Sequence, residues 1–163
     1  MYPEMPVFID FEASSLDLIA SYPIEVGICL PDGETKSWLI KPHVIWSDWS
    51  EKSARIHGIP KQELQTKGLD ISRVVTELNA LLKGPVYCDA WTFDSFWLHR
   101  LFKAGKTQPA FQLDSISSIL NETQIDQWQD IREQVITESN LVTHRAANDA
   151  RILHQTWKRI NSI

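Results

Sequence analysis

Residues 24–40 read IEVGICLPDGETKSWLI, and this stretch decides the fold. Two of its parts, Ile24–Leu30 and Thr35–Ile40, have the length and the β-branched and aromatic content of strands. The Pro-Asp-Gly sequence at residues 31–33 supplies the residues that favour a tight turn. We therefore predict an antiparallel hairpin at this point of the chain.

The sequence on both sides of the hairpin predicts further strands and a set of helices. The expected strands are short apolar runs at Pro6–Glu12, Val86–Ala90 and Phe111–Leu113. The expected helices are Ser47–Leu64 with an interruption at residues 58–60, Ile71–Leu82, Phe93–Ala104, Glu122–Ile136 and Thr143–Ile160. A hairpin followed by strand–helix alternation is typical of an α/β fold with a mixed five-stranded sheet. The 163 residues fit a single domain with its core from about 6 to 160.

Composition and charge narrow the class of protein. The formal net charge is −5, which disfavours a duplex-coating protein with a basic face but allows a nuclease that gathers acids around metal ions. The two cysteines, Cys29 and Cys88, lie in apolar runs and indicate buried thiols in a reducing compartment. No secretory signal and no run of roughly 18 apolar residues is present in the sequence. We therefore expect a cytoplasmic protein with no membrane partner.

Two acids, Asp10 and Glu12, end the first predicted strand. Side chains alternate along a strand, so these two carboxylates share one face while Phe11 points to the other with Val7 and Ile9. Paired acids at the end of a buried strand cost free energy unless they are neutralised. A divalent cation neutralises them, and Mg²⁺ or Mn²⁺ prefers carboxylate oxygens. The alternative is that both acids are solvated at the strand end.

Three more polar residues follow later elements. Asp94 opens the helix after the strand at 86–90, where it could be a helix cap or part of a site at the carboxyl end of the sheet. His144 and Asp149 are five residues apart and do not share a helix face, so we expect His144 at the helix start or on the loop before it. Asp149 then lies one turn into the helix, beside its buried stripe. Asp89 could extend the acidic group, although a solvated strand end is the favoured interpretation.

Taken together and in this order, these motifs resemble the DEDD exonuclease superfamily, also called DnaQ-like, in its histidine subtype. The stretch at residues 54–59 (ARIHGI) is also similar to the family's segment after the hairpin. The resemblance extends from about Pro6 to Ile160, and it implies a ribonuclease H-like fold and 3′–5′ exonuclease activity by a two-metal mechanism. By the same resemblance, the ligands of two Mg²⁺ or Mn²⁺ ions would be Asp10, Glu12, Asp94 and Asp149. His144 would be the general base, a role that suits an imidazole near neutral pH.

Two departures from the family pattern concern the terminal nucleotide. Ala13 stands where the family often has Thr after the Glu, and Asp89 and Ala90 stand where the second motif often has His-Asn. Core packing is the favoured interpretation for Trp46 and for Trp49, and the alternative is that one of the pair lies at the substrate channel and stacks on a base. These departures leave the expected metal and base positions intact.

The expected substrate is the 3′ end of single-stranded DNA or RNA, from which the enzyme would release nucleoside monophosphates. Two other functions stay open at this point. One is a catalytically silent module that binds nucleic-acid ends or docks on another protein, and the other is a small-molecule phosphoesterase that uses the same metals. The sequence shows no oligomerisation motif and does not separate DNA from RNA.

Overall fold

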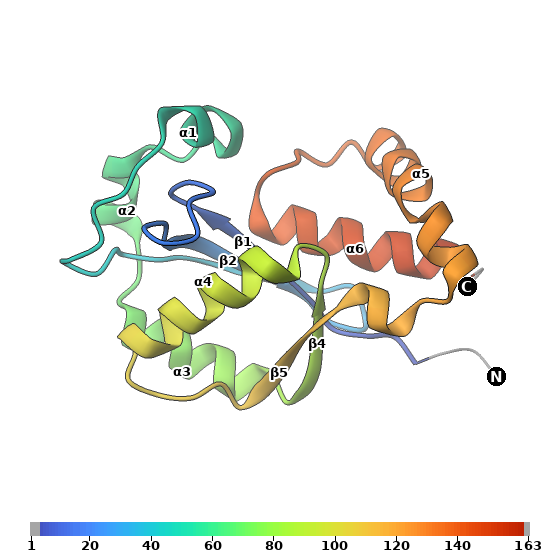
Figure 1. The fold of residues 1–163 in the computed structure, drawn as a ribbon, viewed down its shortest axis with the longest axis horizontal. Helices are drawn as coiled ribbons and strands as arrows, with labels where there is room; N and C mark the ends of the chain where they lie inside the picture. The colour runs from blue at the N-terminus through green and yellow to red at the C-terminus, as the bar shows by residue number, and fades with distance from the viewer. Residues whose placement is uncertain (1–3, 162–163) are drawn as a thin grey trace.

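A computed structural model describes residues 4–161 and places a five-stranded mixed sheet between helices (Figure 1). The strands are β1 (Phe8–Ala13), β2 (Pro23–Cys29), β3 (Thr35–Leu39), β4 (Gly84–Cys88) and β5 (Phe111–Ser115). Their order in the sheet is β3-β2-β1-β4-β5. The first three strands pair antiparallel, whereas β4 lies parallel to β1 and β5 parallel to β4. The predicted α/β class and the hairpin are therefore confirmed.

The helices follow the predicted order with shifted ends. They are α1 (Glu51–His57), α2 (Lys61–Lys67), α3 (Ile71–Leu81), α4 (Trp91–Ala104), the 3₁₀ turn η1 (Ile116–Ile119), α5 (Glu122–Ser139) and α6 (Ala146–Ile160). The predicted interruption at residues 58–60 separates α1 from α2, because Gly58 ends α1 in the left-handed conformation. The last helix begins at Ala146, three residues later than predicted, since His144 has a φ of 64°.

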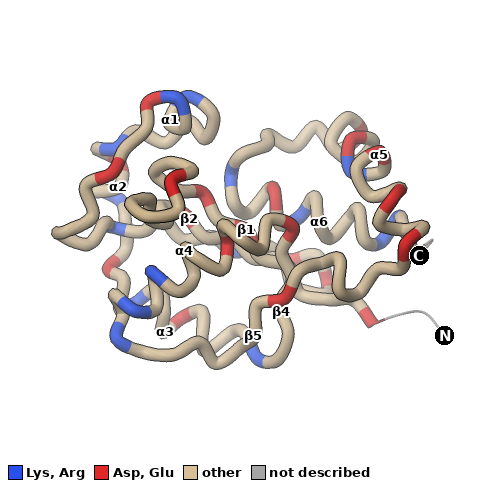
Figure 2. Tube along the Cα trace, viewed as in Figure 1, with Lys and Arg blue, Asp and Glu red and all other residues tan. Residues whose placement is uncertain are grey.

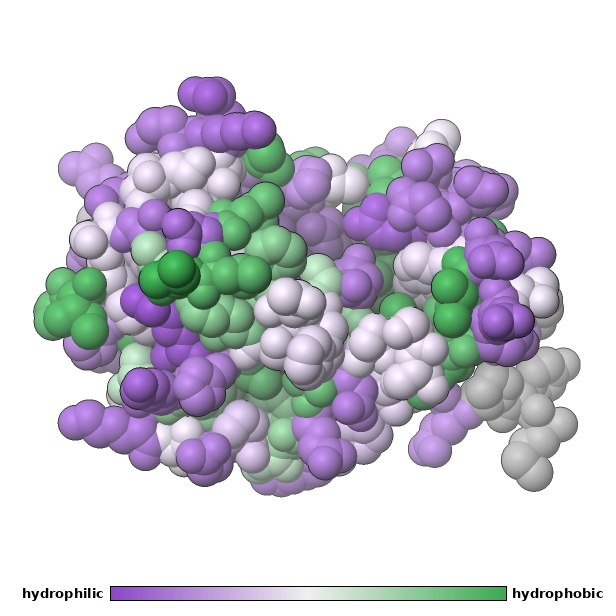
Figure 3. All heavy atoms as spheres, in the orientation of Figure 1, coloured by the Kyte–Doolittle hydropathy of each residue, from purple (hydrophilic) through white to green (hydrophobic). Residues whose placement is uncertain are grey.

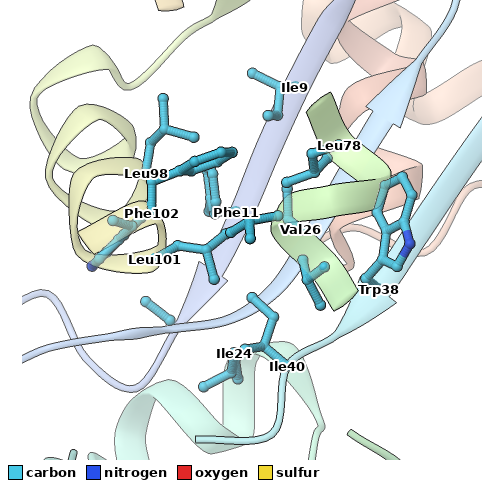
Figure 4. Packing of buried hydrophobic residues seen from close by; sticks show 14 of the residues in the cluster. Ile9, Phe11, Ile24, Val26, Trp38, Ile40, Leu78, Leu98, Leu101 and Phe102 are labelled. Carbon is cyan, nitrogen blue, oxygen red and sulfur yellow. The ribbon is translucent and has the colours of Figure 1, made fainter. Parts of the chain in front are cut away.

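The alternation of β1 separates the apolar core from the predicted site. Ile9 and Phe11 pack on the side of α3 and α4, where Figure 4 shows them with Leu78, Leu98 and Leu101. Phe8 faces the opposite side and packs with the buried stripe of α6. Asp10 and Glu12 fall on this second side by the period of two, as predicted. Near its carboxyl end the strand therefore directs Ile9 and Phe11 toward α3 and α4 and its two acids toward α6.

The start of α6 lies directly against β2. A Cβ atom on Gly27 would lie 2.3 Å from the carbonyl carbon of Ala146 and 2.4 Å from the backbone nitrogen of Ala147. A heavy atom cannot occupy that space, so glycine on the strand is what permits the contact. The small pair Ala146 and Ala147 forms the helix side of the contact, and Gly27 sets the depth at which α6 is seated.

Gly27→Ala should therefore destabilise the protein. The new methyl group meets backbone, which cannot rotate away, so the expected loss is about 1–3 kcal/mol in the free energy of unfolding. Urea unfolding of the purified variant measures this loss. Ser37→Ala is the matched control, since Ser37 pairs with Gly27 from β3 but is exposed. A Gly27→Ala protein as stable as the Ser37→Ala protein would contradict the close seating of α6.

Both cysteines are buried free thiols, as predicted. Within residues 4–161, no helix combines the length and the apolar character needed to cross a membrane.

Candidate active site

One pocket of about 330 Å³ opens at the carboxyl ends of β1 and β4. The five residues of the predicted catalytic set all line it: Asp10, Glu12, Asp94, His144 and Asp149. They come from β1, from the start of α4, from the loop before α6 and from α6 itself. These segments meet because the parallel strands β1 and β4 end at the same edge of the sheet and α6 crosses beside them. Figure 2 shows acidic positions gathered around β1 and the neighbouring helices at the middle of the molecule. The structure thus brings together residues that are up to 139 positions apart in the chain.

The ligand-type side chains form two adjoining groups. In the first group, one carboxylate oxygen each of Asp10, Asp89 and Asp94 lies within 4.8 Å of the others. In the second, Glu12, His144 and Asp149 meet the same limit. Asp10 and Glu12 are two residues apart on the same face of β1, so the two groups lie next to each other. Asp89 is exposed, as expected for a strand end, and also extends the acidic group.

Asp94 enters the pocket from the first turn of α4. Its backbone N–H donates to the carbonyl of Ala90 at 2.9 Å, and its side chain is 1% exposed. Among the described residues, the Oδ2 atoms of Asp94 and Asp10 are buried and have no hydrogen-bond partner. Buried carboxylate oxygens without partners are costly. A divalent cation between them would satisfy both, so this donor set fits a hard metal ion.

His144 lies on the loop before α6, one of the two positions expected from the sequence. Its φ of 64° is a left-handed conformation that non-glycine residues seldom adopt. The His144 N–H donates to both carboxylate oxygens of Asp149, at 3.0 Å and 3.1 Å. This interaction holds the strained backbone and leaves the imidazole exposed at the edge of the pocket. Asp149 therefore positions His144 as well as facing Glu12.

An ion pair between the buried Glu25 and the partly exposed Arg145 holds the start of α6 in place. Glu25 of β2 is 2% exposed and accepts hydrogen bonds from Nε and Nη2 of Arg145 at 3.1 Å and 2.7 Å. It also accepts from the backbone N–H of Ala146 at 2.9 Å. Such two-pronged, charge-assisted pairs are geometrically specific. Because Glu25 lies opposite Glu12 in the sheet, the pair aligns the helix that carries Asp149 with the strand that carries Glu12.

Burial and mutual repulsion weaken the acidity of the site. Burial raises the pKa of Asp10 well above its usual range, and the carboxylates of Asp94 and Asp149 raise it further. The pKa of Asp94 is raised by burial and then by Asp89. Burial, followed by the Asp149 carboxylate, raises the pKa of Glu12 to about 9. Burial also raises the pKa of Asp149. These acids cannot all be ionised near neutral pH without added positive charge.

A family model described as RNase_T, exonuclease, matches residues 7–156 of the chain. The chain belongs to this exonuclease family. It is thus a DnaQ-like DEDD exonuclease domain with the ribonuclease H-like fold of that superfamily. No curated protein matches the chain significantly.

Solved structures of exonuclease I share the fold of this exonuclease. The ssDNA complex of the E. coli enzyme in its zinc-bound form superposes with a TM-score of 0.68 at 14% identity, over 94% of this chain and 40% of that chain. Its complex with a dA16 oligonucleotide gives 0.66 at 13%, over 96% and 42%. The enzyme of Methylocaldum szegediense gives 0.65 at 13%, over 96% and 41%. The chain therefore spans about two fifths of the length of these structures.

The metal-free exonuclease should lose stability as pH rises. Raised native pKa values mean that protonated acids stabilise the fold, and this stabilisation is lost between the ordinary Glu pKa of about 4.3 and the value of about 9 for Glu12. Thermal unfolding in chelator should show a falling Tm across this window. Excess Mg²⁺ or Mn²⁺ should restore the Tm, because cations bind only the folded site.

The Glu12→Gln variant tests the origin of that loss. It should be more stable than the parent in chelator at pH 8, with the advantage shrinking toward pH 5. Glu34→Gln, on the exposed turn between β2 and β3, is the matched control and should show no such trend. A parent Tm in chelator that is flat from pH 5 to 9 and insensitive to cations would argue against the predicted repulsion.

Of the three residues considered as substrate contacts, Ala13, Trp46 and Trp49, only Ala13 lies in the pocket lining. Ala13 lines the pocket. Trp46 is 7% exposed, stacks on Tyr22 at a centroid distance of 5.3 Å and lies under the guanidinium of Arg100. Trp46 is therefore a core residue, which is the interpretation favoured from the sequence, and its alternative role as a substrate-stacking residue is corrected. Trp49 is half-buried, packs edge-on against His57 and is not among the residues that line the pocket.

An apolar wall, formed by Leu16, Ile56 and Phe93, lines the same pocket. Leu16 on the β1–β2 loop is 68% exposed and Ile56 on α1 is 52% exposed. Figure 3 shows hydrophobic surface in this region, over the β1–β2 loop and the start of α4. Sequence patterns do not identify Leu16 and Ile56 as site residues, because apolar side chains on a loop and on a short helix follow no periodic pattern.

His57 also lines the pocket. Its Nδ1 accepts the backbone N–H of Ile59 at 3.0 Å, so the ring proton resides on Nε2. That Nε2 is buried without a hydrogen-bond partner among residues 4–161. Burial lowers the pKa of His57, which favours the neutral ring. His57 thus supports the fold through one nitrogen and offers a free donor through the other.

Proposed function

We propose that this exonuclease removes nucleotides singly from the 3′ end of single-stranded DNA or RNA by hydrolysis, with two divalent cations, Mg²⁺ or Mn²⁺. The observation that carries the proposal is the pair of adjoining carboxylate groups with the unpartnered, buried oxygens of Asp10 and Asp94. A hard divalent cation is the species that such oxygens accommodate.

The four acids and the histidine have separate roles in this proposal. Asp10, Glu12, Asp94 and Asp149 would hold the cations, which when bound neutralise the phosphate and stabilise the departing oxygen. His144 takes the proton from the attacking water, because its imidazole is exposed at the pocket edge beside Glu12 and Asp149. Asp149 keeps His144 in place by accepting its backbone N–H.

The apolar wall supports a single-stranded substrate. A terminal base stacked on Leu16, Ile56 and Phe93 must first leave its duplex, and unpairing costs a few kcal/mol. The net charge of −5 gives little general attraction for a duplex backbone, so binding relies on the cations and on base contacts. The shared fold with an exonuclease I whose structure contains ssDNA further supports this substrate class.

The proposal predicts the digestion pattern of a labelled strand. A 5′-labelled oligonucleotide, as DNA and as RNA, should shorten one nucleotide at a time in Mg²⁺ or Mn²⁺, whereas a base-paired 3′ end should shorten more slowly. A circular single strand is the substrate control and should stay intact. Early release of the labelled 5′ mononucleotide would overturn the polarity, and cleavage of the circle would overturn the exonuclease mode. Binding without cleavage would indicate the silent module instead.

A further inference from the structure

The guanidinium of Arg132 on α5 is paired with one acid, Asp89, through a long ion pair of 3.9 Å. Arg132 is the one lysine or arginine among the described residues that line the active-site pocket. Its Nε is buried without a hydrogen-bond partner, and the nearest acid, Asp89, holds its Oδ2 at 3.9 Å, beyond hydrogen-bond distance. The positive charge also acts on Asp149, whose pKa it lowers against the effect of burial. The guanidinium therefore lies close to the carboxylates with donors to spare.

A second pocket adjoins the active-site pocket at Arg132. It has a volume of about 470 Å³ and shares Asp89 and Arg132 with the active-site pocket. Its other walls include Ser115, Ser117 and Gln129, together with the ring of Trp128. Hydroxyl and amide groups beside an aromatic ring are surfaces that suit a nucleotide. Arg132 thus marks the junction between the catalytic acids and a polar pocket that the proposed chemistry does not use.

The arrangement of the helices and loops around the site indicates the direction in which a bound nucleic-acid strand crosses it. The apolar wall is carried by the β1–β2 loop, α1 and the start of α4, whereas Arg132 is carried by α5. Figure 1 shows α1 and α5 on opposite sides of the start of α6. A strand with its terminal base on the wall and its scissile phosphate at the carboxylates therefore continues toward α5.

We propose that Arg132 binds the phosphate next to the scissile one, in the part of the nucleic acid that remains after the terminal nucleotide is cut off. The second pocket receives the nucleotide that carries this phosphate. This inference rests on the proposed function. A planar guanidinium can donate two parallel hydrogen bonds to a phosphate. Charge favours the same role, because five carboxylates with two dications leave one net negative charge that would repel a second phosphate. Arg132 cancels that charge.

The test compares two substrates that differ in phosphate number. The p-nitrophenyl ester of thymidine 5′-monophosphate has only the scissile phosphate, whereas a thymidine oligonucleotide has the next phosphate as well. Arg132→Gln should lower kcat/KM on the oligonucleotide about 10–100-fold, the equivalent of losing a hydrogen bond to a charged group. The loss on the ester should be at least tenfold smaller. Arg132→Lys should recover part of the oligonucleotide activity.

A methylphosphonate at the inner phosphate sharpens the test. This neutral group should reduce the oligonucleotide activity of the parent strongly but that of Arg132→Gln only slightly, because the two changes remove the same interaction. Arg159→Gln is the matched control: Arg159 ties α6 to Glu138 of α5 and does not line either pocket.

The outcomes separate the two proposals. Equal losses on ester and oligonucleotide, or additive effects of the variant and the methylphosphonate, would show that Arg132 only supports Asp89 and α5. A parent protein that cleaves neither substrate in Mg²⁺ or Mn²⁺ would overturn the proposed function itself.

Discussion

Asp94→Asn should abolish nucleotide release and weaken the binding of divalent cations. The substitution removes a ligand charge from the group that includes Asp10 and Asp89, where no other side chain can replace it without moving. A bound cation contributes several kcal/mol to transition-state stabilisation, so the loss in kcat should be at least about 10³-fold. Metal titration by calorimetry and a nucleotide-release assay measure the two effects. In chelator the variant should be more stable than the parent, because repulsion is relieved.

Asp114→Asn is the matched control for this variant. Asp114 lies near the end of β5, the strand next to β4, and does not line the pocket. Its substitution should leave activity and metal binding close to those of the parent. Full activity of the parent in excess chelator, or undiminished metal binding by Asp94→Asn, would remove the metal assignment.

His144→Ala should reduce turnover by roughly 10²–10⁴-fold, the usual contribution of a positioned proton acceptor. Metal affinity should change far less, because the carboxylates of Glu12 and Asp149 remain. An imidazole accepts a proton only when neutral, so activity of the parent should rise with pH on the acidic side at saturating metal. That limb should disappear in the variant.

The comparison needs a histidine that lies away from the pocket. His99 on α4 is exposed and does not line it, so His99→Ala should keep both the turnover and the pH profile of the parent. Turnover of His144→Ala near that of His99→Ala would assign the base to another group. A pH limb that persists in His144→Ala would lead to the same conclusion.

The parts of the fold that depend on local sequence could be predicted. The Pro-Asp-Gly turn and its flanking strands determine the hairpin without reference to the rest of the chain. Alternation along β1 predicted that Asp10 and Glu12 share a face, and spacing predicted that His144 lies at the start of the last helix or on the loop before it. The three segments that carry the predicted site residues could therefore be identified from periodicity and from the family resemblance.

What could not be predicted depends on contacts between distant segments. Arg145 meets Glu25 across 120 positions, and no periodic pattern reveals such a pair, although an acid within an apolar strand was a signal. The late start of α6 follows from the hydrogen bonds between His144 and Asp149. The core packing of Trp46 likewise depends on Tyr22, a residue distant from it in the sequence.

Two residues of the apolar wall, Leu16 and Ile56, lie on other elements than the acids, and this has a consequence for the evolution of substrate preference. Leu16 and Ile56 are carried by a surface loop and a helix of about two turns, whereas the acids are carried by a central strand and two helices packed on the sheet. Surface loops tolerate exchange and insertion far better than packed elements. Substitutions at Leu16 and Ile56 can therefore change the preference for a sugar or base during evolution while the acids stay in place. A library of variants confined to the β1–β2 loop and α1 should therefore yield proteins with altered substrate preference that keep the catalytic acids.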